Sequence, residues 1–174
     1  MIDPLVPLVL SVSLALLFFM AARHKLGSIL HFQALLGAYE IVPAPLLPLA
    51  ARILPWLEMS LVFLLLVPAT RNIAGAVAAV LLMVYALAMA VNLYRGRGQI
   101  DCGCGDTPQA LSGWLLLRNA VLVLGALVVA LPVLDRGLAA LDMVIVVLFT
   151  AALAMSYLMV EQLLRNHSAI INQE

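Results

Sequence analysis

Long apolar runs separated by short polar breaks are the dominant pattern along this chain. Five runs reach or approach the length of a membrane span, at residues 5–22, 46–67, 73–94, 112–133 and 138–164. A helix needs roughly 20 apolar residues to cross the hydrocarbon core of a bilayer. Open strands would leave backbone groups unpaired in lipid, so each run is expected to be helical. The pattern predicts an all-α polytopic membrane bundle, with a four-helix core and an additional C-terminal helix, as one domain over residues 1–174.

Two features of the N-terminal half refine this picture. No basic residue precedes the first run, so we expect a retained helix rather than a signal peptide. Residues 24–43 mix polar and apolar positions and are too polar to span, which indicates an interfacial helix or a re-entrant loop. The composition agrees with a membrane protein, because 66% of the residues are hydrophobic and 10% are charged. Nine basic and nine acidic residues cancel, and no basic patch points to nucleic acid.

Loop charges give an expected orientation in a bacterial inner membrane. The positive-inside rule places the side richer in Lys and Arg in the cytoplasm. One side carries Arg23, Lys25, Arg52, Arg95, Arg97 and Arg165, and the other carries Arg71 and Arg136. The loops after the first and third runs share a side in either orientation. The count therefore places the third loop, residues 95–111, in the cytoplasm.

That polar loop holds the only two cysteines of the chain, Cys102 and Cys104, separated by Gly103. Gly103 gives the backbone the freedom to close a small disulfide ring, and strained, exposed disulfides tend to be labile and catalytic. Thr107 and Pro108 predict a helix start, whose positive end would favour a thiolate.

The charged residues around the cysteines would adjust their reactivity. Arg95 and Arg97 would add to the stabilisation of a thiolate, while Asp101 and Asp106 oppose it but would serve as proton donors or acceptors. Two other interpretations stay open for the pair. Paired thiolates also suit a soft metal ion such as Cu(I) or Zn, although no third cysteine or adjacent histidine completes a site. The thiols could also be inert, in a membrane scaffold for a redox partner.

Charged residues within the apolar runs are the second candidate for function. Charges inside a membrane are costly and mark functional positions by default. Counted from the cysteine side, Glu58 lies about 12 Å deep and Arg118 about 9 Å deep, so we expect them to pair. The pair would be either a structural clamp or a proton or quinone-headgroup site beneath the cysteines. Lys25 and His24 are expected to snorkel to the surface or to set the topology, with a proton relay or a substrate contact as the alternative for His24.

Several motifs together resemble the MauE family of methylamine-utilisation membrane proteins, within the wider DoxX-like group, over about residues 1–135. They are His24-Lys25-Leu26, Leu47-Pro48, Leu54-Pro55-Trp56-Leu57-Glu58, Asn92-Leu93-Tyr94-Arg95-Gly96-Arg97, Asp101-Cys102-Gly103-Cys104-Gly105, Trp114 and Arg118-Asn119. The resemblance implies that Cys102 and Cys104 form a redox pair. It also implies a role in making or maintaining disulfides of periplasmic methylamine dehydrogenase, alongside a thioredoxin-like partner, MauD.

A looser likeness links the chain to membrane disulfide-forming enzymes of the DsbB and vitamin K epoxide reductase kind. They place a cysteine pair at the mouth of a four-helix bundle near a quinone, which implies a quinone as a carrier here. They use C-x-x-C and a second cysteine pair, both absent from this chain, so any relay must belong to a partner. The leading hypothesis is a membrane thiol–disulfide oxidoreductase. A role in periplasmic disulfides favours a cysteine loop in the periplasm, whereas the charge count favours the cytoplasm. A cytoplasmic loop would still fit a protein that carries electrons across the membrane.

Overall fold

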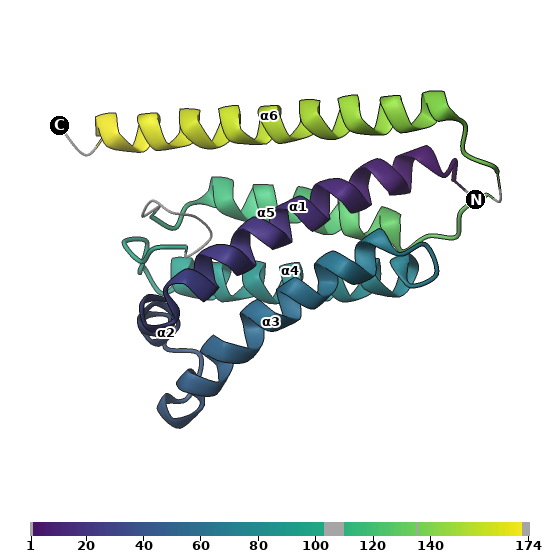
Figure 1. Ribbon diagram of the computed structural model, residues 1–174. Helices are drawn as coiled ribbons and strands as arrows, with labels where there is room; N and C mark the ends of the chain where they lie inside the picture. The colour runs from purple at the N-terminus through teal and green to yellow at the C-terminus, as the bar shows by residue number, and fades with distance from the viewer. Residues whose placement is uncertain (1, 103–109, 135, 172–174) are drawn as a thin grey trace.

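A computed structural model describes residues 2–102, 110–134 and 136–171. The described residues form α1 (Leu5–Gly27), α2 (Ile29–Ala38), the 3-10 turn η1 (Ala44–Leu46), α3 (Leu47–Leu66), α4 (Arg71–Tyr94), α5 (Gly113–Val129) and α6 (Ala140–Ile171) (Figure 1). Beyond two isolated bridges, this part of the chain contains no strand. The predicted all-α class is confirmed.

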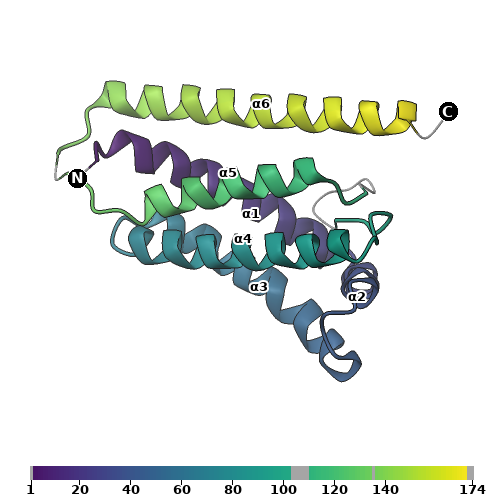
Figure 2. The same cartoon turned by 180° about the vertical axis from the view of Figure 1, so that it is seen from behind.

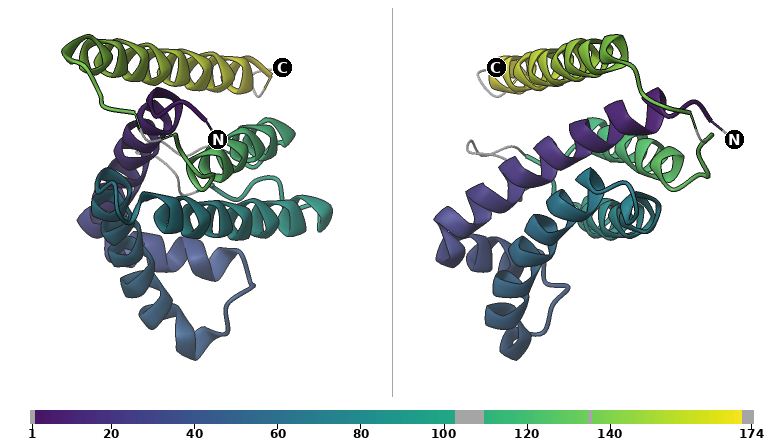
Figure 3. Two further views of the ribbon diagram at one scale, coloured as in Figure 1. Left: turned by 90° about the vertical axis from the view of Figure 1, so that its right-hand side faces the viewer. Right: turned by 45° about the vertical axis from the view of Figure 1, so that its right-hand side comes forward.

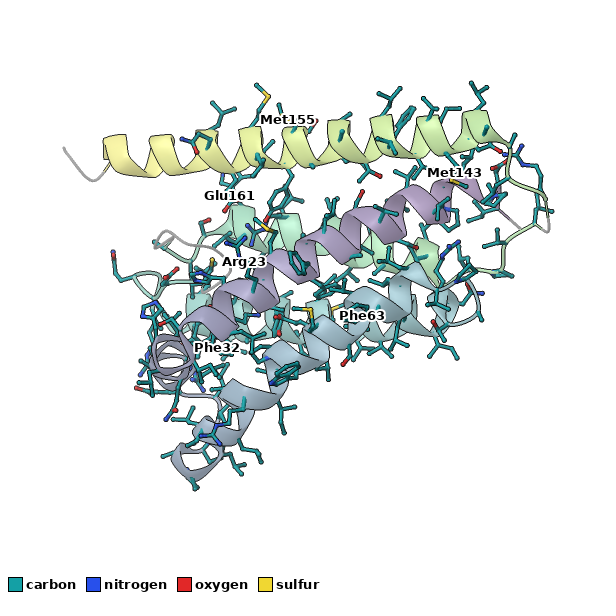
Figure 4. The ribbon with its side chains drawn as sticks, viewed as in Figure 1. Arg23, Phe32, Phe63, Met143, Met155 and Glu161 are labelled. Atoms are coloured by element: carbon teal, nitrogen blue, oxygen red, sulfur yellow. The ribbon has the colours of Figure 1, made fainter. Side chains whose placement is uncertain are left out.

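Four helices form the core and the last one lies outside it. α1 packs along α3, α4 packs along α5, and α1 also contacts α5 and α6. α6 runs along the outside of the core, as views from opposite sides show (Figures 1 and 2). Met155 is exposed on the side of α6 that faces away from the other helices (Figure 4). The predicted arrangement of a four-helix core plus a C-terminal helix is therefore confirmed.

The described helices include four that are long and apolar enough to cross a membrane: α1, the η1–α3 unit, α4 and α6. α5 has 17 residues, so it is about 26 Å long and falls somewhat short of the ~30 Å hydrocarbon core. It ends four residues before the predicted limit at Val133. Pro132 explains this, because proline lacks an N–H group and disfavours helical geometry in the residue before it.

The segment between the first two long helices is helical rather than a re-entrant loop. α2 has ten residues and lies crosswise at one end of the bundle, as Figures 1 and 3 show. Phe32 is the residue of α2 that is buried against the bundle, whereas Leu30 is 82% exposed. This geometry agrees with the interfacial helix that the mixed sequence predicts.

The loops after α1 and α4 lie at the same end of the bundle, as predicted. That end also contains α2 and the C-terminal end of α6 (Figure 1). The opposite end contains the N-terminus, the α3–α4 turn and the α5–α6 connection. There Arg136 forms ion pairs with Asp3, at 3.3 Å, and with Asp142, at 3.5 Å. The two ends are called below the cysteine end and the Arg71 end.

Gly75 permits the close approach of α4 and α5. A Cβ atom at this position would lie 2.9 Å from the backbone nitrogen of Ala130 and 2.9 Å from Cγ1 of Val129. Backbone atoms cannot move aside as a flexible side chain would. Small residues at contacts of this kind are a common feature of membrane helix packing.

We predict that Gly75→Ala lowers the thermal stability of the purified protein. Overpacking of this kind costs about 1–3 kcal/mol, which exceeds the ~1 kcal/mol that alanine gains over glycine in a helix. Gly125→Ala on α5 is the matched control, because its Cβ would meet only Cδ2 of Leu10 at 3.8 Å. Thermal unfolding in detergent measures both. Equal stability of the two variants would contradict the close α4–α5 packing.

Candidate functional site

Cys102 lies at the end of the bundle where α4 ends and α5 begins. It is half-buried and packs against a small apolar cluster formed by Met89, Leu111 and Leu115. Cys104, Asp106, Thr107 and Pro108 lie outside the described residues. The structure therefore places one half of the predicted Cys-Gly-Cys pair, on an apolar support rather than fully in water.

The segment that carries the cysteines is closed at its base. The backbone N–H of Leu111 donates to the carbonyl of Ile100 at 3.2 Å, and Asp101 and Ala110 form an antiparallel bridge. The chain therefore leaves and re-enters the bundle at one place. This closure holds Cys102 against the end of α4.

The fourth long helix begins beside this closure, at the start of the predicted run 112–133. Ala110 lies in the bridge, Ser112 is extended at φ −146° and ψ 161°, and α5 begins at Gly113. The helix start predicted at Thr107 and Pro108 lies outside the described residues. The positive end of the α5 dipole lies further along the chain from the cysteines than the sequence predicts.

Two exposed aromatic residues flank the cysteine loop. Tyr94, the last residue of α4, is 95% exposed, and Trp114, the second residue of α5, is 60% exposed. Tyr and Trp concentrate at the level where lipid meets water. Their positions indicate that the described parts of the loop, residues 95–102 and 110–112, lie at the membrane surface.

An exposed ion pair links this loop to the segment after α2. Nη2 of Arg97 lies 2.6 Å from Oε2 of Glu40. The hydrogen bond and charge of Arg97, with a further contribution from Arg95, lower the pKa of the Glu40 carboxyl from its usual value. Glu40 adopts a φ of 49°, a left-handed conformation that is strained for a residue other than glycine. Arg97 therefore links the cysteine loop to the segment after α2 through Glu40, in addition to any effect on the thiols.

A buried charged cluster joins three helices inside the bundle. Nζ of Lys25 (α1) donates to Oε1 of Glu58 (α3), and the Tyr85 hydroxyl (α4) donates to the same oxygen at 2.7 Å. Lys25 is 6% exposed and Glu58 is 0% exposed. The Lys25 ammonium also lies 4.8 Å from the Tyr85 ring centroid and 5.1 Å from that of Phe32. Figure 4 labels Phe32 on α2 at this end of the bundle.

This cluster overturns two predictions. Lys25 does not snorkel, because α1 continues to Gly27 and carries Lys25 on the buried face that includes Phe18 and Ala22. Glu58 does not pair with Arg118: within the described part of the chain, its Oε1 accepts from Lys25 and Tyr85, and its Oε2 has no hydrogen-bond partner. The residue counts estimate depth from the cysteine end, but they do not say toward which helix a side chain points.

Arg118 connects the core to the C-terminal helix instead. Nη1 of Arg118 donates to the hydroxyl of Tyr157 on α6 at 3.2 Å, and the guanidinium carbon lies 5.7 Å from the ring centroid. His24 is half-buried at the end of α1. It lines a surface cavity of ≈ 290 Å³ together with Met20, Arg23, Gly27 and Ser28.

The buried cluster lies beneath the cysteine loop. Tyr85 and Met89 are four residues apart on α4 and share one face, with a rise of about 6 Å between them. Met89 belongs to the apolar cluster against which Cys102 packs. A spacing rule applied to α1 could have found Lys25, since Phe18, Ala22 and Lys25 recur at helical intervals. Within the described ranges, no group of three or more His, Cys, Asp or Glu side chains is placed to hold a metal ion.

These features define a multi-pass helical membrane protein with a cysteine-bearing loop at one membrane surface and a buried ion pair below it. A family model described as methylamine utilisation protein MauE matches residues 4–132. The chain belongs to the MauE family. The match covers the four-helix core and ends before α6.

Curated relatives agree with this assignment, and each is called methylamine utilization protein MauE. That of Methylophilus methylotrophus is 42% identical over 63% of this chain and 58% of its own length. That of Paracoccus denitrificans is 39% identical over 75% of this chain and 71% of its own. That of Methylorubrum extorquens is 33% identical over 87% of this chain and 88% of its own. No solved structure matches, so the looser likeness to DsbB-type enzymes gains no support.

We predict that Lys25→Met and Glu58→Met each destabilise the protein by about 3–5 kcal/mol, because each leaves one buried charge without its partner. The double variant removes both charges and should lose less than the sum of the two single losses. Arg52→Met is the control, since Arg52 is an exposed cation on α3. Unfolding in detergent measures all four variants. Strictly additive losses would show that the two side chains do not interact.

Proposed function

We propose that this protein is a membrane thiol–disulfide oxidoreductase. It exchanges disulfides or electrons with a thioredoxin-like partner, for the maturation of periplasmic disulfide-containing proteins such as methylamine dehydrogenase. The observation that carries the proposal is the position of Cys102, on a closed loop at the membrane surface and supported by the ends of α4 and α5. Membership of a family named for methylamine utilisation supports the substrate class.

The exchange is balanced within the two dithiol pairs. A thiolate of this chain attacks one sulfur of the partner's disulfide, that S–S bond breaks, and a mixed disulfide forms. The second cysteine of this chain then attacks the mixed disulfide. A Cys102–Cys104 disulfide closes and the partner leaves as a dithiol, which takes up the two protons. The same steps in reverse transfer the disulfide to the partner.

A return to the starting state needs a two-electron carrier from outside the chain, because the sequence contains only two cysteines. A membrane quinone would supply this chemistry from the lipid, and a second dithiol or disulfide on the partner would supply it from water. In either case the loop must remain open to a protein partner. Its location between Tyr94 and Trp114 at the membrane surface supports this.

We place the cysteine loop on the periplasmic side of the inner membrane. The proposed substrates fold there, and thiol exchange requires direct contact between sulfur atoms. The charge count that favours the cytoplasm loses one contribution, because Lys25 is buried and paired with Glu58. The five arginines that remain at the cysteine end still exceed the two at the Arg71 end, so the proposed orientation runs against the charge count.

Single cysteine variants in a methylamine-using bacterium test the exchange. We expect one of Cys102→Ser and Cys104→Ser to accumulate a mixed disulfide with a thioredoxin-like protein, because the cysteine that would resolve the mixed disulfide is missing. The adduct should appear as a heavier band on a non-reducing gel and disappear on reduction. Both variants should yield little assembled methylamine dehydrogenase.

The double variant Cys102→Ser/Cys104→Ser is the control and should form no adduct. Normal methylamine dehydrogenase assembly in the double variant would reject catalysis by the pair and favour a scaffold. Stoichiometric Cu(I) or Zn binding with no adduct in either single variant would also contradict the proposal, in favour of a metal-transfer protein.

A further inference from the structure

Among the residues that the structure describes, Arg71 is a buried cation without a hydrogen-bond or ion-pair partner, at the end of the bundle opposite the cysteines. It is 9% exposed, and its Nε atom is buried and makes no hydrogen bond. The other described charges near that end satisfy one another, since Arg136 pairs with Asp3 and Asp142. A buried, uncompensated guanidinium in a membrane protein is costly and is expected to meet an anion.

Arg71 is also the first residue of α4, where backbone N–H groups lack acceptors. The Thr70 hydroxyl donates to the carbonyls of Leu64, at 2.8 Å, and Val67, at 3.3 Å, so it does not cap the helix. In the part of the chain that is described, the N–H groups of residues 71–73 have no acceptor, and the first helical bond is from Ala74 to Thr70. Side chains tilt toward the N-terminus of a helix, so that of Arg71 leaves on the side of these donors. The full positive charge of the Arg71 guanidinium and the partial positive charges of the free N–H groups therefore lie together at the start of α4.

We propose that Arg71 and the first turn of α4 bind the phosphate group of a phospholipid. A spanning helix that begins at Arg71 places this turn at the level where a bilayer presents its phosphates. Ile73, Val77 and Val80 are 71%, 43% and 65% exposed and recur at helical spacing on α4, directly below the site. They form an apolar stripe for the acyl chains. A free phosphate ion would use Arg71 and the N–H groups but would gain nothing from this stripe.

The C-terminus of α5 also lies beside this part of α4, as the contact between Gly75 and Ala130 shows. Its carbonyls carry at most about half a negative charge, and those of Ala126 and Leu127 already accept from the N–H of Ala130. This partial charge does not replace an anion. If the α5 C-terminus were the partner of Arg71, Arg71 variants would lose the same stability with and without lipid. A lipid phosphate as the partner predicts a loss that depends on lipid.

The test compares phospholipid binding by the full-length protein and its variants in detergent micelles. Phosphatidylglycerol is titrated while native mass spectrometry counts bound lipid and thermal unfolding follows stability. We expect Arg71→Gln to weaken phosphatidylglycerol binding at least about tenfold, which corresponds to the loss of one charge-assisted contact. Arg71→Lys keeps the charge and should retain most of the binding. Arg136→Gln removes a paired, half-exposed arginine at the same end and should bind like the unaltered protein.

Inorganic phosphate in place of the lipid separates the two possible sources of the anion. Weak binding of inorganic phosphate, with tight binding of phosphatidylglycerol, supports a lipid site. Equal gains in stability from both would overturn the lipid assignment. If Arg71→Gln fails to fold, unaltered protein is compared with Arg71→Lys alone. The proposal is overturned if neither the unaltered protein nor Arg71→Lys retains phosphatidylglycerol. It is also overturned if Arg71→Gln folds and retains as much phosphatidylglycerol as the unaltered protein.

Discussion

The ion pair between Lys25 and Glu58 is the interaction on which the arrangement of the bundle depends. Both charges are removed from water, and each would be costly in the bilayer without the other. Because the partners lie on α1 and α3 and the Tyr85 hydroxyl of α4 joins them, the three helices must meet at one depth. Tyr85 lies one turn below Met89, so the same constraint reaches the apolar cluster beneath Cys102. A buried polar contact thus sets the position of the surface loop.

The helix pattern could be predicted from the apolar runs, because membrane span length and backbone hydrogen bonding leave few alternatives. The sharing of one end by the first and third loops followed from the number of spans between them. Boundaries were less accurate where tertiary contacts decide them. α1 continues past its basic residues because Lys25 finds a buried partner in Glu58.

The partners of the candidate site could not be predicted in the same way. Glu58 and Arg118 were expected to pair on the basis of similar depth, yet depth does not fix which neighbouring helix a side chain meets. Glu58 meets α1 and α4, while Arg118 meets Tyr157 on α6. The cysteines stand out in the sequence, but the packing of Cys102 against Met89, Leu111 and Leu115 depends on contacts between distant segments. That Arg71 has no partner among the described residues likewise emerges only from the arrangement of the helices in space.

The central claim is that Cys102 and Cys104 form a redox-active pair that faces the periplasm. Sided thiol labelling tests it directly: spheroplasts are treated with a membrane-impermeant maleimide, with and without prior reduction, and labelling is scored by gel shift against the double serine variant. If the proposed function holds, labelling from outside occurs only after reduction, because the resting pair would be an accessible disulfide. Labelling that requires lysis and needs no reductant would place reduced thiols in the cytoplasm and contradict the account.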